Sequence, residues 1–97
     1  MRAIAPNHLT VRQGEPFEIA LPEPGATGYL YEPYFDPDFV SFGGVKRAIS
    51  PHVGGENLAI FHFTARQIGK SDIWFRLTAP WDPQPAGEKH VCVDVGS

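Results

Sequence analysis

The chain has 97 residues, of which 42% are apolar and 12% aromatic, and we expect one compact domain over residues 1–97. Ten prolines and ten glycines are more than helical domains tolerate, which favours short strands joined by turns. The formal charge of −3, the pI of about 5.7 and the lack of a basic cluster beyond Lys46-Arg47 argue against a nucleic-acid partner.

Seven segments of the chain are expected to form strands. Alternating polar and apolar side chains indicate the first two, in which Phe17, Ile19 and Leu21 share the inward face. Pro33 indicates an edge strand or a bend in the third, and Gly43-Gly44 indicates a bulge in the fourth. The seven segments are residues 8–12, 16–21, 29–35, 39–50, 57–66, 71–78 and 89–95.

Three Gly- and Pro-rich connections separate these strands: EPGATG at 23–28, PHVGGE at 51–56 and APWDPQPAGE at 79–88. About seven short strands in roughly 100 residues, with turns every 8–12 residues, are typical of an immunoglobulin-like β-sandwich. In that all-β fold the first and third connections emerge at the same end. The second connection reaches this end if the 39–50 segment runs back along the sheet.

Cys92 is the one cysteine of the sequence, so an intramolecular disulfide is impossible and packing must hold the fold. The N-terminal segment lacks the apolar run of a signal peptide, and no stretch approaches the roughly 20 apolar residues of a membrane span. We therefore expect a monomer without a membrane partner. It would be cytoplasmic as written, and periplasmic or secreted if a leader has been removed.

Catalytic and metal chemistry find little support in the sequence. The four histidines occur in no spacing used by zinc sites, and Asp36-Pro37-Asp38 has too few ligands for a calcium loop, so we expect no metal and no cofactor. His90, Cys92 and Asp94 project from one face of the last strand. Their spacing of about 7 Å along the strand is too long for a direct nucleophile-to-base hydrogen bond. A solvated outer face is favoured over an active site, and we expect no enzyme.

Two tryptophans differ in their expected roles. Trp81 lies in a polar segment with a proline on one side and Asp82-Pro83 on the other. It either packs over the edge of the core or stands out as a rigid anchor for a partner. Trp74 is opposite in phase to its inward-facing neighbours Ile73 and Phe75, so we expect it on the outer face of its sheet.

Taken in chain order, PGATGY at 24–29, HVGG at 52–55 and APW at 79–81 resemble the loop motifs NPTTGY, GxGG and RPW of the chagasin family of cysteine peptidase inhibitors. The intervals between the motifs agree, and the resemblance spans nearly the whole chain. It implies an immunoglobulin-like domain whose loops 24–29, 52–55 and 79–83 enter the active-site cleft of a papain-like cysteine peptidase. Binding would be tight and reversible, without covalent chemistry.

The resemblance also implies which residues bind the peptidase. Thr27 and Gly28 would lie at the catalytic centre, and Tyr29 would bury its ring behind the first loop. The chain departs from the family motifs where Pro24-Gly25-Ala26 replaces Asn-Pro-Thr, where His52 replaces a glycine and where Ala79 replaces an arginine. The implied binding residues are Ala26, Thr27, Gly28, Tyr29, Val53, Gly54, Gly55, Pro80 and Trp81.

A second interpretation is a non-inhibitory immunoglobulin-like module that recognises a glycan or a protein partner through the loop aromatics Tyr29, Tyr31 and Trp81. On its own, EPGATGY is also compatible with a plain turn in which Gly28 supplies a positive φ. The inhibitor interpretation requires Thr27, Gly54 and Trp81 to share one end of the domain.

Overall fold

The computed structural model describes residues 1–24, 28–49 and 57–97, and in these ranges the chain is all-β. None of the described segments is a helix that could cross a bilayer. The strands are β1 (Arg2–Ile4), β2 (His8–Arg12), β3 (Pro16–Glu23), β4 (Leu30–Tyr34), β5 (Val40–Ile49), β6 (Asn57–Ala65), β7 (Gly69–Ala79) and β8 (Asp82–Gly96).

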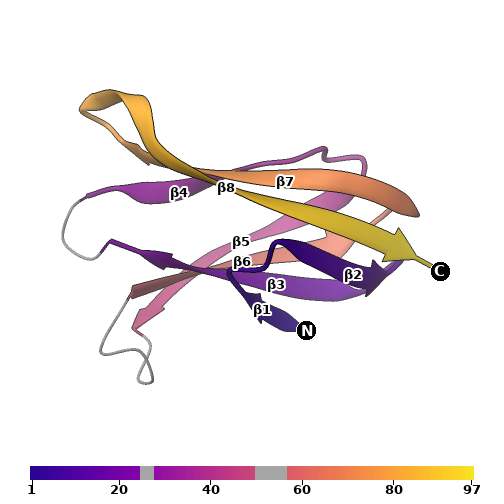
Figure 1. Ribbon diagram of the computed structural model, residues 1–97. Coiled ribbons are helices and arrows are strands. Elements are labelled where there is room, and N and C mark those ends of the chain that lie inside the picture. The colour runs from indigo at the N-terminus through magenta and orange to yellow at the C-terminus, as the bar shows by residue number, and fades with distance from the viewer. Residues whose placement is uncertain (25–27, 50–56) are drawn as a thin grey trace.

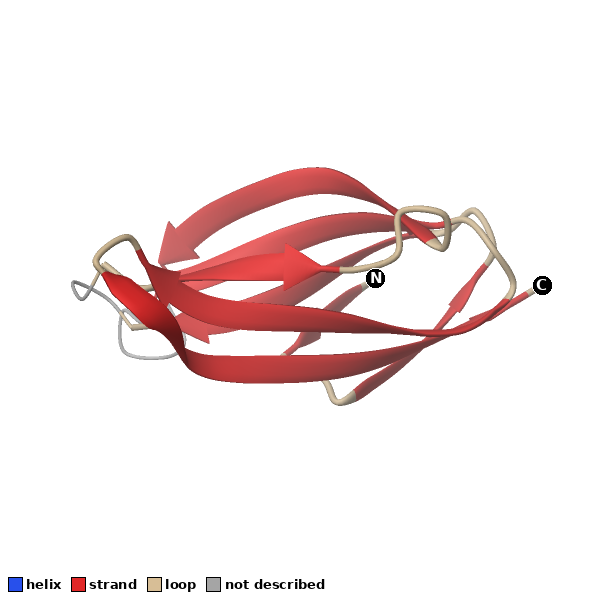
Figure 2. Cartoon of the chain, turned by 90° about the horizontal axis from the view of Figure 1, so that it is seen from above, coloured by secondary structure: helices blue, strands red, loops and turns tan. Residues whose placement is uncertain are grey.

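The strands form two four-stranded sheets, ordered β1-β3-β6-β5 and β2-β8-β7-β4, which face each other as a sandwich (Figure 1). Seen from above, the strands run along the length of the molecule and the connections gather at its two ends (Figure 2). Cys92 is a free thiol. The predicted immunoglobulin-like β-sandwich without a disulfide is confirmed.

Strand β1 brings the count to eight, and the sequence did not indicate it. Its three residues are too few to show an alternating pattern, and the strand exists because it pairs in parallel with β3, where Arg2 lies beside Glu18. Strand β2 also pairs in parallel, with β8, and places His8 beside Cys92. Each sheet is therefore completed at one edge by a strand from the N-terminal segment.

The core between the sheets is rich in phenylalanine. Phe17 of β3 pairs with Phe63 of β6 and their rings stack with centroids 5.6 Å apart, while the rings of Phe61 and Phe75 meet across the two sheets at 4.8 Å. All four side chains are almost fully buried. Since burial of one such side chain contributes about 1.5–3 kcal/mol, this cluster is a main source of stability in a fold without a disulfide.

Two local predictions about the edges of the sheets are confirmed. Pro33 lies in β4, which is an edge strand, where a residue without a backbone N–H is tolerated. The register between β5 and β6 shifts at Phe42 and Gly44, and Gly44 has a φ of +110°. Strands β4 and β5 are thus the open edges on one side of the sandwich.

Candidate functional site

The strand ends that flank the first two sequence motifs lie at one end of the sandwich. Glu23, at the end of β3, pairs with Asn57 at the start of β6, and Asn57 pairs with Ile49 at the end of β5. Glu23 also reaches across to the other sheet, where its carboxylate accepts the backbone N–H of Tyr31. The flanks of the first two loops and the turn between β7 and β8 lie at the same end of the molecule, opposite the C-terminus (Figure 1).

The predicted binding residues divide between described and undescribed parts of the chain. Four are described, namely Gly28, Tyr29, Pro80 and Trp81. Five lie outside the described residues, namely Ala26, Thr27, Val53, Gly54 and Gly55. The geometry of the site is built from the first group and from the strands that lead into the loops.

The third motif is the turn of a tight β-hairpin, so the prediction of a ten-residue connection over 79–88 is wrong. Strand β7 ends at Ala79 and β8 begins at Asp82, and these two residues pair, which leaves Pro80 and Trp81 as the turn. The prolines of β8 suggested a loop because proline cannot donate to a strand ladder. They are accommodated where the β7–β8 register shifts, since an irregular extended strand tolerates proline.

Trp81 stands out from this turn and lies against Gly28 of the first motif. Its side chain is 64% exposed, so the outward position is observed and not burial over the core. Gly28 has a φ of +80°, and a Cβ atom there would lie 2.4 Å from Cη2 of Trp81. Glycine thus permits both this backbone conformation and the approach of the indole. Two motifs that are distant in sequence form one surface.

Tyr29 fixes the first motif to the start of β8. Its ring meets the indole of Trp81 edge-on, with centroids 5.7 Å apart, and its hydroxyl donates to Oδ2 of Asp82 at 2.8 Å. The backbone N–H of Gln84 donates to Oδ1 of Asp82 at 3.0 Å. The bonds from Gln84 and Tyr29 lower the pKa of Asp82, whose carboxylate in turn raises the pKa of Tyr29. At neutral pH the pair is therefore an anionic acceptor and a neutral donor.

Glu23 is a site residue that the sequence analysis missed. Among the described residues, Glu23 is the charged residue that is buried, with 5% exposure. Its Oε1 accepts a hydrogen bond from Nε of Arg47 at 3.1 Å. The alternation that turns Leu21 inward also turns Glu23 inward two residues later, so its burial had a signal in the sequence. Its partners had none, because they come from other strands.

A hollow of about 370 Å³ adjoins the surface formed by Gly28 and Trp81. It opens between the start of β4, the end of β5 and the β7–β8 turn. Leu30 supplies an exposed apolar wall and Arg47 a cationic one. The lining residues are Gly28, Leu30, Tyr31, Glu32, Arg47, Thr78, Ala79 and Pro80.

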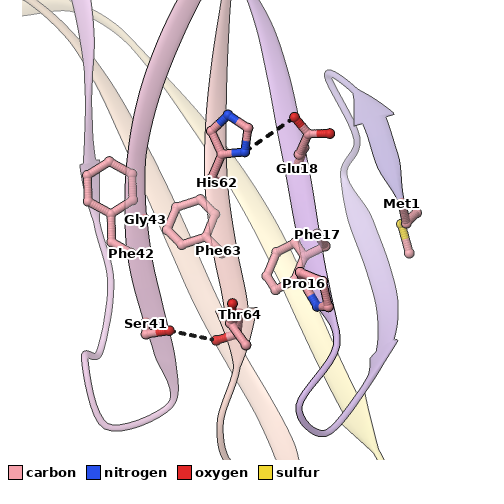
Figure 3. A pocket seen from close by; sticks show the side chains of 10 residues that line it. All are labelled: Met1, Pro16, Phe17, Glu18, Ser41, Phe42, Gly43, His62, Phe63 and Thr64. Carbon is pink, nitrogen blue, oxygen red and sulfur yellow. Dashed lines mark hydrogen bonds and ion pairs between the residues drawn. The ribbon is translucent and has the colours of Figure 1, made fainter.

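A second hollow of about 340 Å³ lies over β3, β5 and β6 and includes none of the motif residues (Figure 3). Glu18 and His62 face each other there, with Oε2 and Nδ1 3.3 Å apart, and the hydroxyl of Ser41 donates to the carbonyl oxygen of Thr64 at 3.5 Å. These side chains hold neighbouring strands together. This hollow is separate from the motif-bearing end.

The face with His90, Cys92 and Asp94 lies on the outer side of the second sheet, as predicted. Nε2 of His90 is 2.6 Å from Oδ1 of Asp72, and the ring stacks on Trp74 with centroids 4.2 Å apart. The imidazole is therefore engaged by Asp72 and Trp74, and Trp74 is a packing residue of the outer face. Among the described residues no group of three or more potential metal ligands gathers.

The sequence matches the family described as "Chagasin family peptidase inhibitor I42" over residues 10–95. This match covers most of the chain and both described motif segments. The chain belongs to the chagasin family of peptidase inhibitors. This assignment makes it an inhibitor and not an enzyme. No curated protein matches the sequence.

Solved structures similar to this chagasin-family chain include a protein described as a cysteine protease inhibitor. The cysteine protease inhibitor EhICP2 from Entamoeba histolytica has a TM-score of 0.80 and 16% identity, covering 98% of this chain and 95% of its own. Amebosin has a TM-score of 0.70 and 24% identity, covering 98% and 96%. PbICP-C in complex with falcipain-2 has a TM-score of 0.69 and 19% identity, covering 99% and 90%. At these identities the similarity shows the fold.

Of the departures from the chagasin motifs at residues 52 and 79, only the second can be placed in the fold. His52 lies outside the described residues. Ala79 is buried at 7% and pairs with Asp82, and it lines the same hollow as Arg47. A guanidinium group is therefore present at this corner although residue 79 is alanine.

Proposed function

We propose that this chagasin-family protein is a tight-binding, reversible inhibitor of papain-like cysteine peptidases, and that loops 24–29, 52–55 and 79–83 enter the active-site cleft. The observation that carries the proposal is the contact of Trp81 with Gly28, which joins the first and third motifs in one exposed surface. A papain-like partner is supported by PbICP-C, which was solved with falcipain-2, a papain-like peptidase.

The described part of this surface is preformed. The indole of Trp81 packs against Gly28, and the hydroxyl of Tyr29 donates a hydrogen bond to Asp82. A side chain that is ordered before binding loses less entropy on binding, so Trp81 is suited to act as the main anchor. Three loops cover about 800 Å² on one partner, which is a standard inhibitor interface.

In the proposed complex, Thr27-Gly28 of the first loop lies at the catalytic thiolate of the peptidase. An uncharged threonine side chain followed by glycine, which has no side chain, would allow a close approach to the thiolate. Acylation requires a carbonyl carbon held within attack distance of the sulfur, with the leaving amine aligned. A loop that presents no such bond blocks the nucleophile without reacting, which makes inhibition reversible.

The aromatic side chains fit the alternative module for glycans or other partners less well. That function would use Tyr29, Tyr31 and Trp81 as open stacking surfaces. Tyr31 is half-buried and packs against the core, and the hydroxyl of Tyr29 is bound by Asp82. Of the three, Trp81 is the one with a largely exposed ring.

Titration of papain with the purified protein tests the proposed function. We expect saturable inhibition that is reversed on dilution. Trp81→Ala should raise the inhibition constant by about 30-fold or more, as expected for loss of an anchor worth about 2 kcal/mol. Its melting temperature should change little, because the side chain is 64% exposed.

Trp74→Ala is the matched control, since it removes a 41% exposed tryptophan from the outer face of the second sheet. It should inhibit papain as the unmodified protein does. Absence of inhibition at micromolar protein would refute the proposed function. Equal inhibition by Trp81→Ala and the unmodified protein would refute the assigned role of the hairpin turn.

A further inference from the structure

The carboxylate of Glu23 joins three strands at the motif-bearing end. Its side chain is 3% exposed and both of its oxygens are used: Oε2 accepts the backbone N–H of Tyr31 at 2.9 Å, and Oε1 accepts from Nε of Arg47 at 3.1 Å. Glu23 belongs to β3, Tyr31 to β4 and Arg47 to β5. One buried group therefore links strands of both sheets.

These three residues occupy the flanks of two loops. Glu23 is the last residue of β3, directly before the first loop. Tyr31 is the second residue of β4, the strand that follows this loop. Arg47 is two residues before the end of β5, which leads into the second loop. Strands β3 and β4 lie in different sheets and do not pair with each other. The carboxylate thus supplies a direct link between the two ends of the first loop.

Stability alone does not account for an ion pair with a buried carboxylate at this place. Removing the Glu23 carboxylate from water is costly, and an apolar side chain of similar volume at a buried position is often as stable or more so. What the ion pair adds is direction, because hydrogen bonds fix the relative position of the groups that they join. The position that it fixes is that of the loop flanks.

Arg47 also reaches the surface next to the motifs. It is 40% exposed and lines the 370 Å³ hollow together with Gly28 and Pro80. A shift of the Arg47 side chain therefore alters a wall of the hollow that Gly28 and Pro80 also line.

We infer that Glu23 and Arg47 are positioning residues for peptidase binding: their ion pair holds the flanks of the first and second loops in the binding geometry. The inference rests on the proposed function and assigns these residues a role that none of the loop motifs contains. It predicts that the pair contributes to inhibition beyond its contribution to folding.

Three variants test this role by measurement of inhibition constants for papain, with folding followed by thermal unfolding. Glu23→Gln keeps an acceptor for Tyr31 but loses the charge, and Arg47→Met keeps the length of the side chain without its donors. Each should raise the inhibition constant by about tenfold, which corresponds to the ordering of one or two side chains on binding. Arg47→Lys keeps the charge and should restore most of the inhibition.

The double variant with Glu23→Met and Arg47→Met separates positioning from folding. Its apolar pair should unfold at or above the temperature of the single variants, yet it should still inhibit about tenfold more weakly than the unmodified protein. Amide hydrogen exchange provides a second readout. Exchange should accelerate at Gly28 and Tyr31, while core amides such as that of Phe61 keep their protection.

Glu18→Gln is the matched control, because Glu18 lies on the same strand and is paired with Arg2 at 3.2 Å, away from the loops. It should leave inhibition unchanged. The inference is overturned if the unmodified protein inhibits papain and the double variant inhibits equally well, or if exchange at Tyr31 does not change. If the unmodified protein does not inhibit at all, the proposed function fails, and faster exchange at Tyr31 would then support a structural role alone.

Discussion

Replacement of Gly28 with alanine perturbs the contact that joins the first and third motifs. A Cβ atom at this position would lie 2.4 Å from Cη2 of Trp81, which is closer than side-chain carbons pack, so the indole must move. The φ of +80° is also unfavourable for alanine. Gly28→Ala therefore combines a backbone penalty with displacement of the proposed anchor.

The two effects should appear in different measurements. The backbone penalty is about 1–2 kcal/mol of the free energy of unfolding, or a fall of about 4–16 °C in melting temperature for a domain of this size. The indole is largely exposed and can move at little cost to the fold. Its displacement should instead raise the inhibition constant for papain by about 10- to 30-fold, part of the loss expected for removing the tryptophan.

Gly14 offers a matched control for the backbone penalty. It has a φ of +83°, and a Cβ atom there would meet nothing within 4 Å. Gly14→Ala should lower the melting temperature to a similar extent and leave inhibition unchanged. Adding Gly28→Ala to Trp81→Ala should cause little further loss of inhibition, because both changes remove the same contact. Undiminished inhibition by Gly28→Ala would refute the positioning of Trp81 by this glycine.

Three further predictions concern the Tyr29 hydroxyl, the core and the single thiol. Because Asp82 raises the pKa of Tyr29, their contact stabilises the fold below about pH 10 and is lost as the pH rises through the folded-state pKa. Urea unfolding at increasing pH should show this alkaline loss of stability, and the Tyr29→Phe variant should lack it. Identical pH profiles for the two proteins would contradict the contact. Phe75→Ala removes a fully buried ring and should cost about 3–5 kcal/mol in urea unfolding; a cost below about 1 kcal/mol would contradict its place in the core. Cys92→Ser should inhibit papain unchanged, and a weakened variant would show that the thiol takes part.

Much of the sandwich could be predicted because its signals are local. The alternation of Ile73 and Phe75 around Trp74 gave the correct faces of β7, and a proline at Pro33 indicated the edge strand. Gly44 marked the bulge in β5 for the same local reason, since its φ is one that other residues avoid.

What could not be predicted depends on partners that are distant in sequence. Strand β1 is too short to carry a pattern and exists through its pairing with β3. The prolines after Trp81 indicate a long loop because they lack the backbone N–H groups of a strand ladder. They carry no information on the pairing of Ala79 with Asp82, which makes Pro80-Trp81 a hairpin turn. Burial of Glu23 is consistent with the alternation along β3 but was not predicted, and nothing near it in sequence identifies Arg47 as its partner.

The parallel pairing of β2 with β8 has a consequence for how the fold assembles. His8 lies beside Cys92, so this part of the second sheet forms only after almost the whole chain has been brought together. The β5–β6 and β7–β8 pairs join neighbouring segments and can form early, whereas docking of β2 on β8 is slow because it loses more chain entropy. We therefore expect refolding to be slow for a chain of this length, with the turn at Trp81 present well before β2 docks on β8.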